Sequence, residues 1–205
     1  NNILGQLICV LLEQEPDLNI NLQEISKSEI IHKVFANDNE FGFIFRTTYN
    51  DIYTDALPDG LIFDPYLEGS LIFSTSQQSE YAKFKSISLK KAVQAPLCTY
   101  SPHTESQSLF DSFFFETMHM DTRISSESNF SIYSQKILRG VANALSVQFS
   151  IDEQPTNYVE GSKVLRIRED IKIFLGLIYR ADAVLSENAH FFLHELRNLI
   201  ASSKK

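Results

Sequence analysis

The sequence is poor in cysteine, in basic residues and in long apolar runs. Its 205 residues contain only two cysteines, Cys9 and Cys98, and each falls in a segment whose pattern predicts burial. We interpret both as small hydrophobic side chains, with a disulfide between the two segments as the alternative. A chain of this length buries roughly 70% of its unfolded surface and needs no covalent staple, which favours a reducing compartment.

The deficit of basic residues excludes one class of function for this chain. It has 18 lysines and arginines against 26 acidic residues, a formal net charge of −8. Binding to a phosphate backbone depends on clustered Lys and Arg, so we expect any DNA contact to come from another segment. No apolar run approaches the length of a membrane span, and no signal peptide precedes the first predicted helix. Because the chain begins at Asn1 without an initiator methionine, we interpret it as a piece of a longer protein.

Helix and strand patterns alternate over the first 46 residues. Apolar residues at helical spacing predict a helix before residue 15, and Leu18–Leu22 alternates as a strand. Ser26 and Glu29 form a capping-box pattern that opens a second helix. The run 41–45 is apolar on both faces, which is typical of a parallel strand covered by helices, and Arg46 follows it. Ligands in open α/β sheets bind at the carboxyl ends of strands, so this order predicts an α/β domain with a site near Arg46.

The rest of the chain continues the alternation of helices and strands. Strands are expected at Leu71–Ser74, Leu97–Tyr100, Met120–Ser125, Val164–Ile167 and Ile173–Tyr179. Helices are expected at Leu89–Val93 after the cap Ser88, from Thr104 through Phe114, from Asn129 or Ser131 through Leu145, and from Ser186 through Ile200.

Taken together, these segments resemble the effector-binding domain of LysR-type transcriptional regulators. The resemblance rests on pattern and order over nearly the whole chain, at Leu11, Pro16, Ile20, Glu24, Ser26, Glu29, Ile30 and residues 41–46, 71–74, 96–102, 140–142, 178–180, 185–186 and 192–197. It implies an α/β fold of two Rossmann-like lobes joined by two crossover strands, of the type II periplasmic-binding-protein kind. Residues 1–70 and 164–205 would form the first lobe, and residues 71–163 the second.

Candidate ligand-binding residues in the first lobe are Arg46, Ser26, Ser28, Asn1 and Asn2. A guanidinium at position 46 could pair with a carboxylate or phosphate, or it could turn to solvent or pair with a structural acid. The two serines lie at a helix start, where amide donors favour an anion, although Ser26 could serve only as the N-cap. The resemblance places a hydroxyl of this helix start at the effector cleft. It also adds the two asparagines, because the family presents polar groups there; the alternative for these two residues is disorder at the chain end.

Candidates in the second lobe lie where a buried strand joins a capped helix: Tyr100, Ser101, Pro102, His103 and Thr104. This is again the carboxyl end of a strand. Thr104 could act only as a helix cap, and His103 could be an exposed loop residue.

Catalytic and metal-binding patterns are weak in this chain. His190 and His194 have a spacing that can bind a metal, but on a surface helix we expect both to be solvated, and we expect no metal and no cofactor. No nucleophile elbow, P-loop or dinucleotide fingerprint occurs, so we expect no enzyme.

The resemblance implies a ligand-sensing regulatory domain of a transcription factor, which binds a small, anionic effector between its lobes. It also implies a cytoplasmic homodimer, tetrameric in the full-length protein, with contacts through the exposed side of Asn2–Glu15 and the strand Leu18–Glu24. DNA would be contacted only by an N-terminal winged helix-turn-helix outside this chain, and no membrane would be involved. The alternatives are an extracytoplasmic solute-binding protein of a transporter and an enzyme of the same fold. We expect Arg46→Ala to abolish effector affinity with little loss of stability.

Overall fold

The computed structural model describes residues 2–15, 23, 25–100, 124–149, 155 and 157–203, with side chains described between residues 8 and 202. Its helices are α1 (Asn2–Gln14), α2 (Lys27–Phe35), the 3-10 turn η1 (Glu80–Lys83), α3 (Leu89–Gln94), α5 (Phe130–Leu138) and α6 (Glu187–Ser203). Its strands are β1 (Phe41–Tyr49), β2 (Ile52–Tyr53), β3 (Leu61–Ser76), β4 (Ser86–Ile87), β5 (Leu97–Tyr100), β6 (Ile124–Glu127), β7 (Ala144–Phe149), β8 (Ser162–Ile167) and β9 (Ile171–Arg180). Outside the described residues lie the predicted strand Leu18–Leu22 and the predicted helix after Thr104.

A long strand, β3, organises the main sheet, whose order is β2-β1-β9-β3-β8-β4, with β7 also paired to β3. On one edge β3 pairs first with β9, from Leu61 opposite Arg180 to Ser70 opposite Lys172, and then with β8. The register shifts after Pro65, where a bulge turns the following side chains to the other face. The first half of β3 was not predicted, because the bulge and its irregular burial hide the alternation.

The prediction of a parallel strand at residues 41–45 is wrong. β1 runs antiparallel to both of its neighbours, with Phe41 opposite Tyr179 in β9. Both faces of β1 are nevertheless covered, because Phe43 packs on the main core cluster and Ile44 packs with α2 on the other face. Burial on both faces, rather than strand direction, therefore produces the continuous apolar run.

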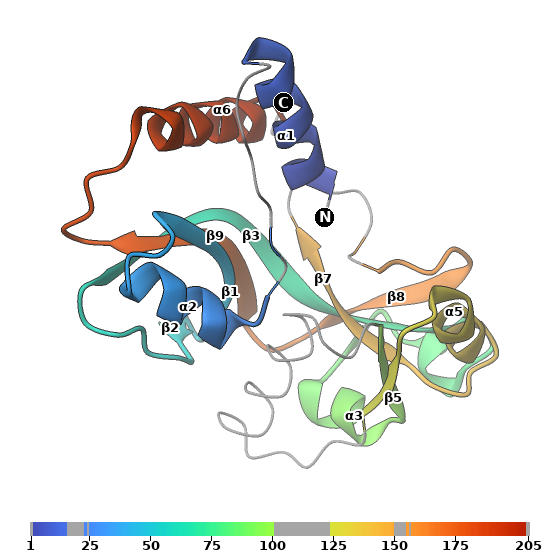
Figure 1. Ribbon diagram of the computed structural model, residues 1–205. Helices are drawn as coiled ribbons and strands as arrows, with labels where there is room; N and C mark the ends of the chain where they lie inside the picture. The colour runs from blue at the N-terminus through green and yellow to red at the C-terminus, as the bar shows by residue number, and fades with distance from the viewer. Residues whose placement is uncertain are drawn as a thin grey trace.

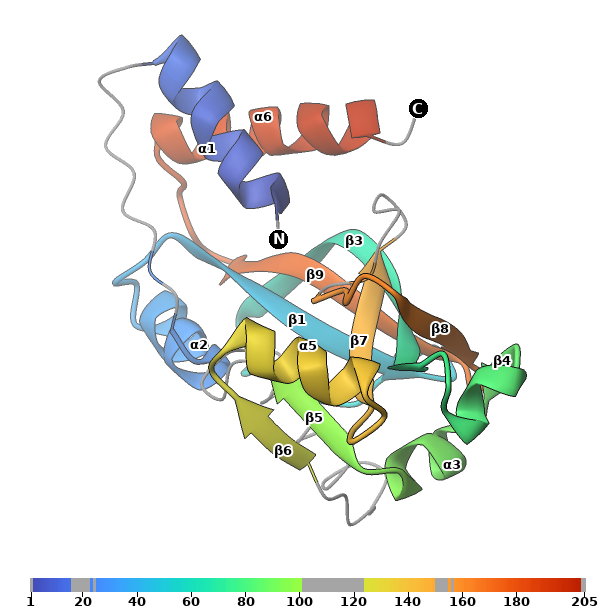
Figure 2. The same ribbon diagram turned by 90° about the vertical axis from the view of Figure 1, so that its right-hand side faces the viewer.

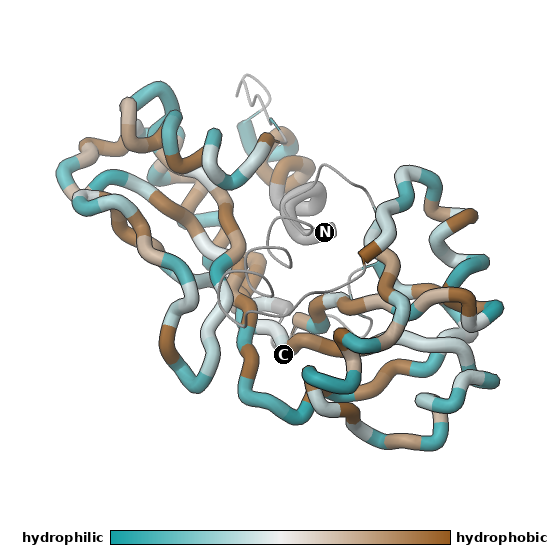
Figure 3. The backbone as a smooth tube through the Cα atoms, turned by 90° about the horizontal axis from the view of Figure 1, so that it is seen from below, coloured by the Kyte–Doolittle hydropathy of each residue, from teal (hydrophilic) through white to brown (hydrophobic). Residues whose placement is uncertain are grey.

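Helices cover the two faces of the main sheet (Figure 1). α1 and α6 lie on one face, where Leu11 and Leu196 join the main core cluster. α2 lies on the opposite face, where Val34 packs with Ile178. Cys9 is exposed and not buried as predicted, because it lies two positions before Leu11 and so faces away from the core. Seen from below, apolar stretches follow the strands and hydrophilic stretches gather in the turns (Figure 3).

A smaller layer of β5, β6, α3 and α5 packs beside the second half of β3 (Figure 2). Strands β5 and β6 run parallel. Cys98 of β5 is buried, as predicted, and packs as a free thiol against Tyr133. Asn143 ties this layer to the sheet. Its side chain accepts a hydrogen bond from Thr75 Oγ1 at 2.6 Å and donates one to the Pro96 carbonyl oxygen at 3.1 Å.

The predicted helix from Asn129 is shorter than expected. Asn129, one of the two starts that the sequence left open, is its N-cap. The helix ends at Leu138, and Gly140 follows with a φ of 70°. The Val141 amide donates to the Lys136 carbonyl oxygen at 2.9 Å, which closes the helix in a Schellman motif. Of the apolar residues after the glycine, Leu145 belongs to strand β7, whereas Val141 and Ala142 lie between the helix and that strand.

Candidate functional site

The start of α2 brings together two of the predicted anion-binding residues. Ser26 is the N-cap, as predicted: its Oγ accepts a hydrogen bond from the Glu29 amide at 3.3 Å and lies 3.2 Å from Ser28 Oγ. The Glu29 carboxylate lies 3.9 Å from Lys33 Nζ, on the outer side of the helix. Both hydroxyls are therefore next to the first-turn amides of α2, where the helix dipole favours negative charge.

Lys27, the first residue of α2, links this helix start to β1. Its Nζ donates hydrogen bonds to the Phe45 carbonyl oxygen at 2.8 Å and to Asp55 Oδ2 at 3.1 Å. The Lys27 side chain is only 20% exposed. The same carboxylate pairs with Arg46, so the ammonium group and the guanidinium meet at Asp55.

Arg46 is buried in the interior of β1 and not at a strand end as predicted, because the strand continues to Tyr49. Its Nε donates to the Asp55 carboxylate at 3.1 and 3.3 Å, and its Nη2 donates to the Asp55 carbonyl oxygen at 2.6 Å. The guanidinium also stacks on the Tyr53 ring, with its central carbon 3.9 Å from the ring centroid. The sequence left three alternatives open for Arg46: a ligand, solvent or a structural acid. In the structure it pairs with an acid, Asp55. Its role toward a ligand stays a prediction.

The cluster of Lys27, Arg46 and Asp55 carries a surplus positive charge, because two cations share one carboxylate. Thr48 lies two residues beyond Arg46 and therefore on the same face of β1. It is 4% exposed, and its Oγ1 has no hydrogen-bond partner among the described residues. Partial burial strengthens electrostatic interactions, so this place suits a small anion.

The second half of the predicted site is described only at Tyr100, the last residue of β5. Its ring packs edge-on against Phe130, with the centroids 5.2 Å apart, and against Tyr133 at 5.8 Å. The other predicted site residues lie outside the described residues: Asn1, the side chain of Asn2, Ser101, Pro102, His103 and Thr104. The structure thus places Ser26 and Ser28 on either side of Lys27, whose ammonium group shares Asp55 with Arg46, whereas the position of the second-lobe set stays a prediction.

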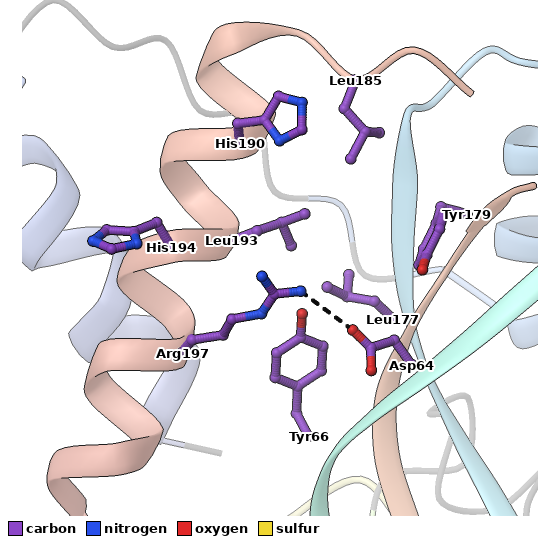
Figure 4. Close-up of a pocket in the computed structure, with 9 residues that line it drawn as sticks. All are labelled: Asp64, Tyr66, Leu177, Tyr179, Leu185, His190, Leu193, His194 and Arg197. Atoms are coloured by element: carbon purple, nitrogen blue, oxygen red, sulfur yellow. Dashed lines mark ion pairs between the residues drawn. The ribbon is translucent and has the colours of Figure 1, made fainter. Parts of the chain in front are cut away.

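A separate pocket of about 370 Å³ lies between α6 and the strands β3 and β9 (Figure 4). Leu177, Leu185 and Leu193 form its apolar part, and Tyr66 and Tyr179 line it from the sheet. None of these five residues was among the predicted site residues.

Polar side chains at this pocket come from both α6 and β3. Arg197 Nη2 lies 3.6 Å from Asp64 Oδ2, and the Tyr66 hydroxyl points toward the guanidinium (Figure 4). Burial raises the pKa of the Tyr66 phenol, and the negative charge of Asp64 raises it further. His190 and His194 also line the pocket. Within the described part of the chain, no three His, Cys, Asp or Glu side chains are grouped so that they could hold a metal ion.

Sequence reasoning missed Lys27, Tyr53 and Asp55. The position of Lys27 between two serines at a predicted helix start was a usable signal, because an ammonium group there adds to the field of the helix. The other two residues follow a turn in a segment without periodicity. Only the fold brings them to Arg46.

No family model and no curated protein matches this chain. Among solved structures, the effector-binding domain of QuiR in complex with shikimate is similar, with a TM-score of 0.66 at 16% identity over 97% of this chain and 90% of that one. The regulatory domain of CcmR from Synechocystis PCC6803, in complex with 2-PG, gives a TM-score of 0.68 at 13% identity over 96% and 90%. HinK, a LysR-family regulator from Pseudomonas aeruginosa, gives 0.63 at 17% identity over 96% of this chain but 65% of its own.

This chain therefore spans about two thirds of the length of HinK. Among the described residues, none of the helices combines the length and apolarity that a membrane crossing requires. At sequence identities this low, the structural similarity establishes the fold alone. It confirms the fold class predicted from the sequence. The chain has the mixed α/β, type II periplasmic-binding-protein-like fold of the effector-binding domains of LysR-family transcriptional regulators.

Proposed function

We propose that this chain is the ligand-sensing domain of a LysR-type transcription regulator, and that it binds a small anionic effector beside the start of α2. The fold supports the proposal, because two of the similar domains were solved in complex with small molecules, shikimate and 2-PG. A ligand-binding role also agrees with the weakness of the catalytic patterns in the sequence. The proposed activity is binding that changes a conformational equilibrium, rather than turnover.

The observation that carries this proposal is the sharing of Asp55 by Lys27 and Arg46. An ammonium group has three N–H donors, and Lys27 directs two hydrogen bonds to Phe45 and Asp55, which leaves a third donor for a ligand. Arg46 is 7% exposed, so it contributes charge and holds Asp55 in position. The hydroxyl of Ser28 and the first-turn amides of α2 complete the anion site.

The two proposed lobes are residues 1–70 with 164–205, and residues 71–163. The first crossing lies inside β3, and the return path follows β8 and β9, which pair with β3 on one edge. In this proposal the effector lies between the α2 start and the segment after Tyr100. The ligand closes the lobes only if it binds the closed state more tightly than the open one.

Calorimetric titration with shikimate, 2-PG and inorganic phosphate tests the site. We expect at least one of these anions to bind, and we expect Lys27→Met to raise its dissociation constant about tenfold, the worth of one charge-assisted hydrogen bond. Ser28→Ala should weaken binding by a smaller factor. The matched control is Lys163→Met, because Lys163 is an exposed lysine of β8. An unchanged dissociation constant in Lys27→Met would overturn the site.

The whole protein would act in the cytoplasm as a DNA-binding regulator. We propose that residues outside this chain form an N-terminal winged helix-turn-helix that contacts DNA. Intact mass and N-terminal sequencing of the native gene product test this. A basic helix-turn-helix upstream supports the regulator, whereas a signal peptide alone upstream would assign the chain to a solute-binding protein instead.

A homodimer is the proposed assembly, with tetramers in the full-length protein. Its contact would involve the exposed side of α1, where Leu12 is 40% exposed, and residues 18–24. Light scattering measures the assembly directly. We expect a dimer mass for this chain and a monomer mass for Leu12→Lys. A monomer mass for the unaltered chain would contradict the dimer proposal.

A further inference from the structure

We propose that the sheet edge at β4 is a docking surface for an extended, acidic segment of another protein. β4 lies at the end of the main sheet, next to β8 and α3 (Figure 2). Cations surround it, and we name them the basic edge: Lys83, Lys85, Lys90, Lys91, Arg166 and Arg168. None of them belongs to the cluster at the start of α2, so the proposal goes beyond the function proposed above.

Unlike the other basic residues that the structure describes, those of the basic edge have no carboxylate partner. Within the described part of the chain, lysines and arginines form an ion pair everywhere except at residues 83–91, 139 and 163–168. The whole chain nevertheless has 26 acidic residues against 18 basic ones. Cations that stay unpaired in one place, on a chain with surplus acids, indicate a surface that attracts an external anionic group.

Pairing between β4 and β8 brings three of these cations together. β4 runs parallel to β8 with Ser86 opposite Arg166, so Arg166 lies beside the residue that follows Lys85. The Arg168 amide donates a hydrogen bond to the Ile87 carbonyl oxygen at 3.0 Å. The side chains of Lys85, Arg166 and Arg168 are all exposed. Three positive charges therefore face solvent around one short strand.

The turn after β8 also fixes the start of α3, which carries Lys90. The Glu169 carboxylate accepts a hydrogen bond from the Leu89 amide at 2.7 Å, so this acid caps the helix. Lys90 follows Leu89 and is exposed. Glu80 and Asp170 are exposed nearby, but the cations of the basic edge outnumber these acids.

An aromatic ring positions two further cations without neutralising them. The Lys91 Nζ lies 4.3 Å from the centroid of the Phe84 ring, and the Lys83 Nζ lies 5.3 Å from the same centroid. Such contacts hold ammonium groups in place but leave their charge and N–H donors for a partner. Phe84 itself is half-buried, so the surface also offers apolar contact.

The cations flank β4 on both faces of the sheet. Leu165 and Ile167 of β8 pack on the main core cluster, so Arg166, between them, points to the opposite face. η1 and α3 lie on the face of the core cluster, which Tyr81 and Leu89 join. β4 ends the sheet order, and no described strand pairs with its outer edge. An extended peptide beside this edge directs successive side chains to opposite faces, so its carboxylates reach both groups of cations.

These features favour an acidic protein segment over DNA and over a second copy of this chain. The net charge of −8 opposes binding to a phosphate backbone, whose charges are rigidly spaced along a duplex. A symmetric contact between two copies would set the basic edge against itself, and like charges repel. An extended segment rich in Asp and Glu meets neither obstacle.

Fluorescence anisotropy with a labelled oligoglutamate peptide tests this surface on the full chain. We expect saturable binding at low salt that weakens as salt is added, because exposed ion pairs are screened. An oligoglutamine peptide with the same label should bind at least about tenfold more weakly.

Two double variants separate the basic edge from the net charge of the chain. Lys85→Glu with Arg166→Glu should weaken oligoglutamate binding at least about tenfold. Lys33→Glu with Arg197→Glu is the matched control, because it changes the net charge equally on α2 and α6, and it should weaken binding less than about twofold. The neutral variants Lys85→Gln and Arg166→Gln alter exposed side chains only, and each should weaken binding about threefold.

Equal weakening by the two double variants would reduce the effect to net charge and overturn the proposal. Loss of binding in Lys27→Met would overturn it as well, because the peptide would then lie at the α2 start. Tighter binding of a labelled DNA duplex than of oligoglutamate would assign the basic edge to nucleic acid instead.

Two further results would overturn the proposal. Light scattering should give the same mass for the unaltered chain and for Lys85→Glu with Arg166→Glu, and a smaller mass for the variant would assign the surface to a second copy. No saturable binding of oligoglutamate at low salt would show that these cations only protect a sheet edge from strand addition.

Discussion

Asp55 holds Arg46 through both its side chain and its main chain. Its carboxylate accepts from Arg46 Nε at 3.1 Å, and its carbonyl oxygen accepts from Nη2 at 2.6 Å. The pairing links β1 to the residue that lies two positions after β2, and the guanidinium stacks on the Tyr53 ring. An arginine held in this way is part of the folded structure as well as of a candidate site. The same carboxylate also holds Lys27, so the helix start, the strand and the turn form one charged unit.

Arg46→Ala should therefore destabilise the protein, contrary to the small effect expected from the sequence. The Arg46 side chain is 9% exposed and that of Asp55 is 29% exposed, so the pair is partly shielded from water. Removal of Arg46 leaves Asp55 paired with Lys27 alone. It loses the hydrogen bonds from Nε and Nη2 and the stacking of the guanidinium on Tyr53. We expect the free energy of unfolding to fall by about 2 kcal/mol in urea denaturation.

Arg166→Ala is the control for this variant, because Arg166 is an exposed arginine of β8. It should change the free energy of unfolding by less than about 0.5 kcal/mol. Equal stabilities for the two variants would show that the contact between Arg46 and Asp55 contributes nothing to the fold.

Asn143→Ala should be among the more damaging single changes outside the apolar core. Asn143 is 4% exposed and bonds both to Thr75 in β3 and to the Pro96 carbonyl oxygen before β5. Alanine leaves the buried Thr75 hydroxyl without this acceptor and removes one of two hydrogen bonds to the Pro96 carbonyl oxygen, which still accepts from the amide of residue 143 at 2.8 Å. We therefore expect a loss of about 2 kcal/mol in urea denaturation. Asn198→Ala, on the exposed side of α6, should stay within about 0.5 kcal/mol of the unaltered chain.

Gly176→Ala and Gly42→Ala test where a methyl group can be accommodated. At Gly176 a Cβ would lie 2.5 Å from the Asp64 carbonyl oxygen and 2.6 Å from the Phe63 ring, so the backbone of β3 would have to move. At Gly42 the obstacle is the Cγ2 methyl group of Ile30, so a side chain of α2 must shift while the strand backbone can stay in place. Thermal unfolding should show a loss of about 3 kcal/mol for Gly176→Ala and about 1 kcal/mol for Gly42→Ala. The reverse order would contradict the β3–β9 register.

Stability should decline at high pH because of Tyr133. Burial raises the pKa of this phenol far above its usual value of about 10. The folded state therefore keeps a proton that the unfolded state loses. The contribution to stability is complete below about pH 10 and is lost progressively as the pH rises above it.

Phenolate absorbance near 295 nm follows this titration in the folded protein. We expect one tyrosine to ionise only as the chain unfolds and to be absent from the titration of Tyr133→Phe. Ionisation of all eight tyrosines before the loss of helical circular dichroism would show that Tyr133 is not shielded.

Local chemistry explains which elements the sequence predicts correctly. Ser26 and Ser88 cap helices as predicted, and Asn129 is the cap of the two that the sequence offered, with Ser131 as the other. Each of the three side chains bonds to an amide only two or three residues later. The final helix was also predicted, because burial on one face leaves a helical period in the sequence. The strand at residues 97–100 was predicted as well, although it is buried on both faces. The end of α5 could also have been predicted, because Gly140 has the positive φ that this helix terminus requires.

Tertiary structure alone decided the direction of β1, the length of β3 and the partners of the charged groups. A strand covered on both faces has the same composition whether its neighbours are parallel or antiparallel, so the pattern around Phe43 could not predict the pairing with β9. The pocket joins Asp64 to Arg197, which are far apart in the sequence. No periodicity records such a contact, because it exists only after the sheet and α6 have packed together. The sequence thus determined the order of the elements and the fold class, whereas packing between distant segments determined where charges and cavities meet.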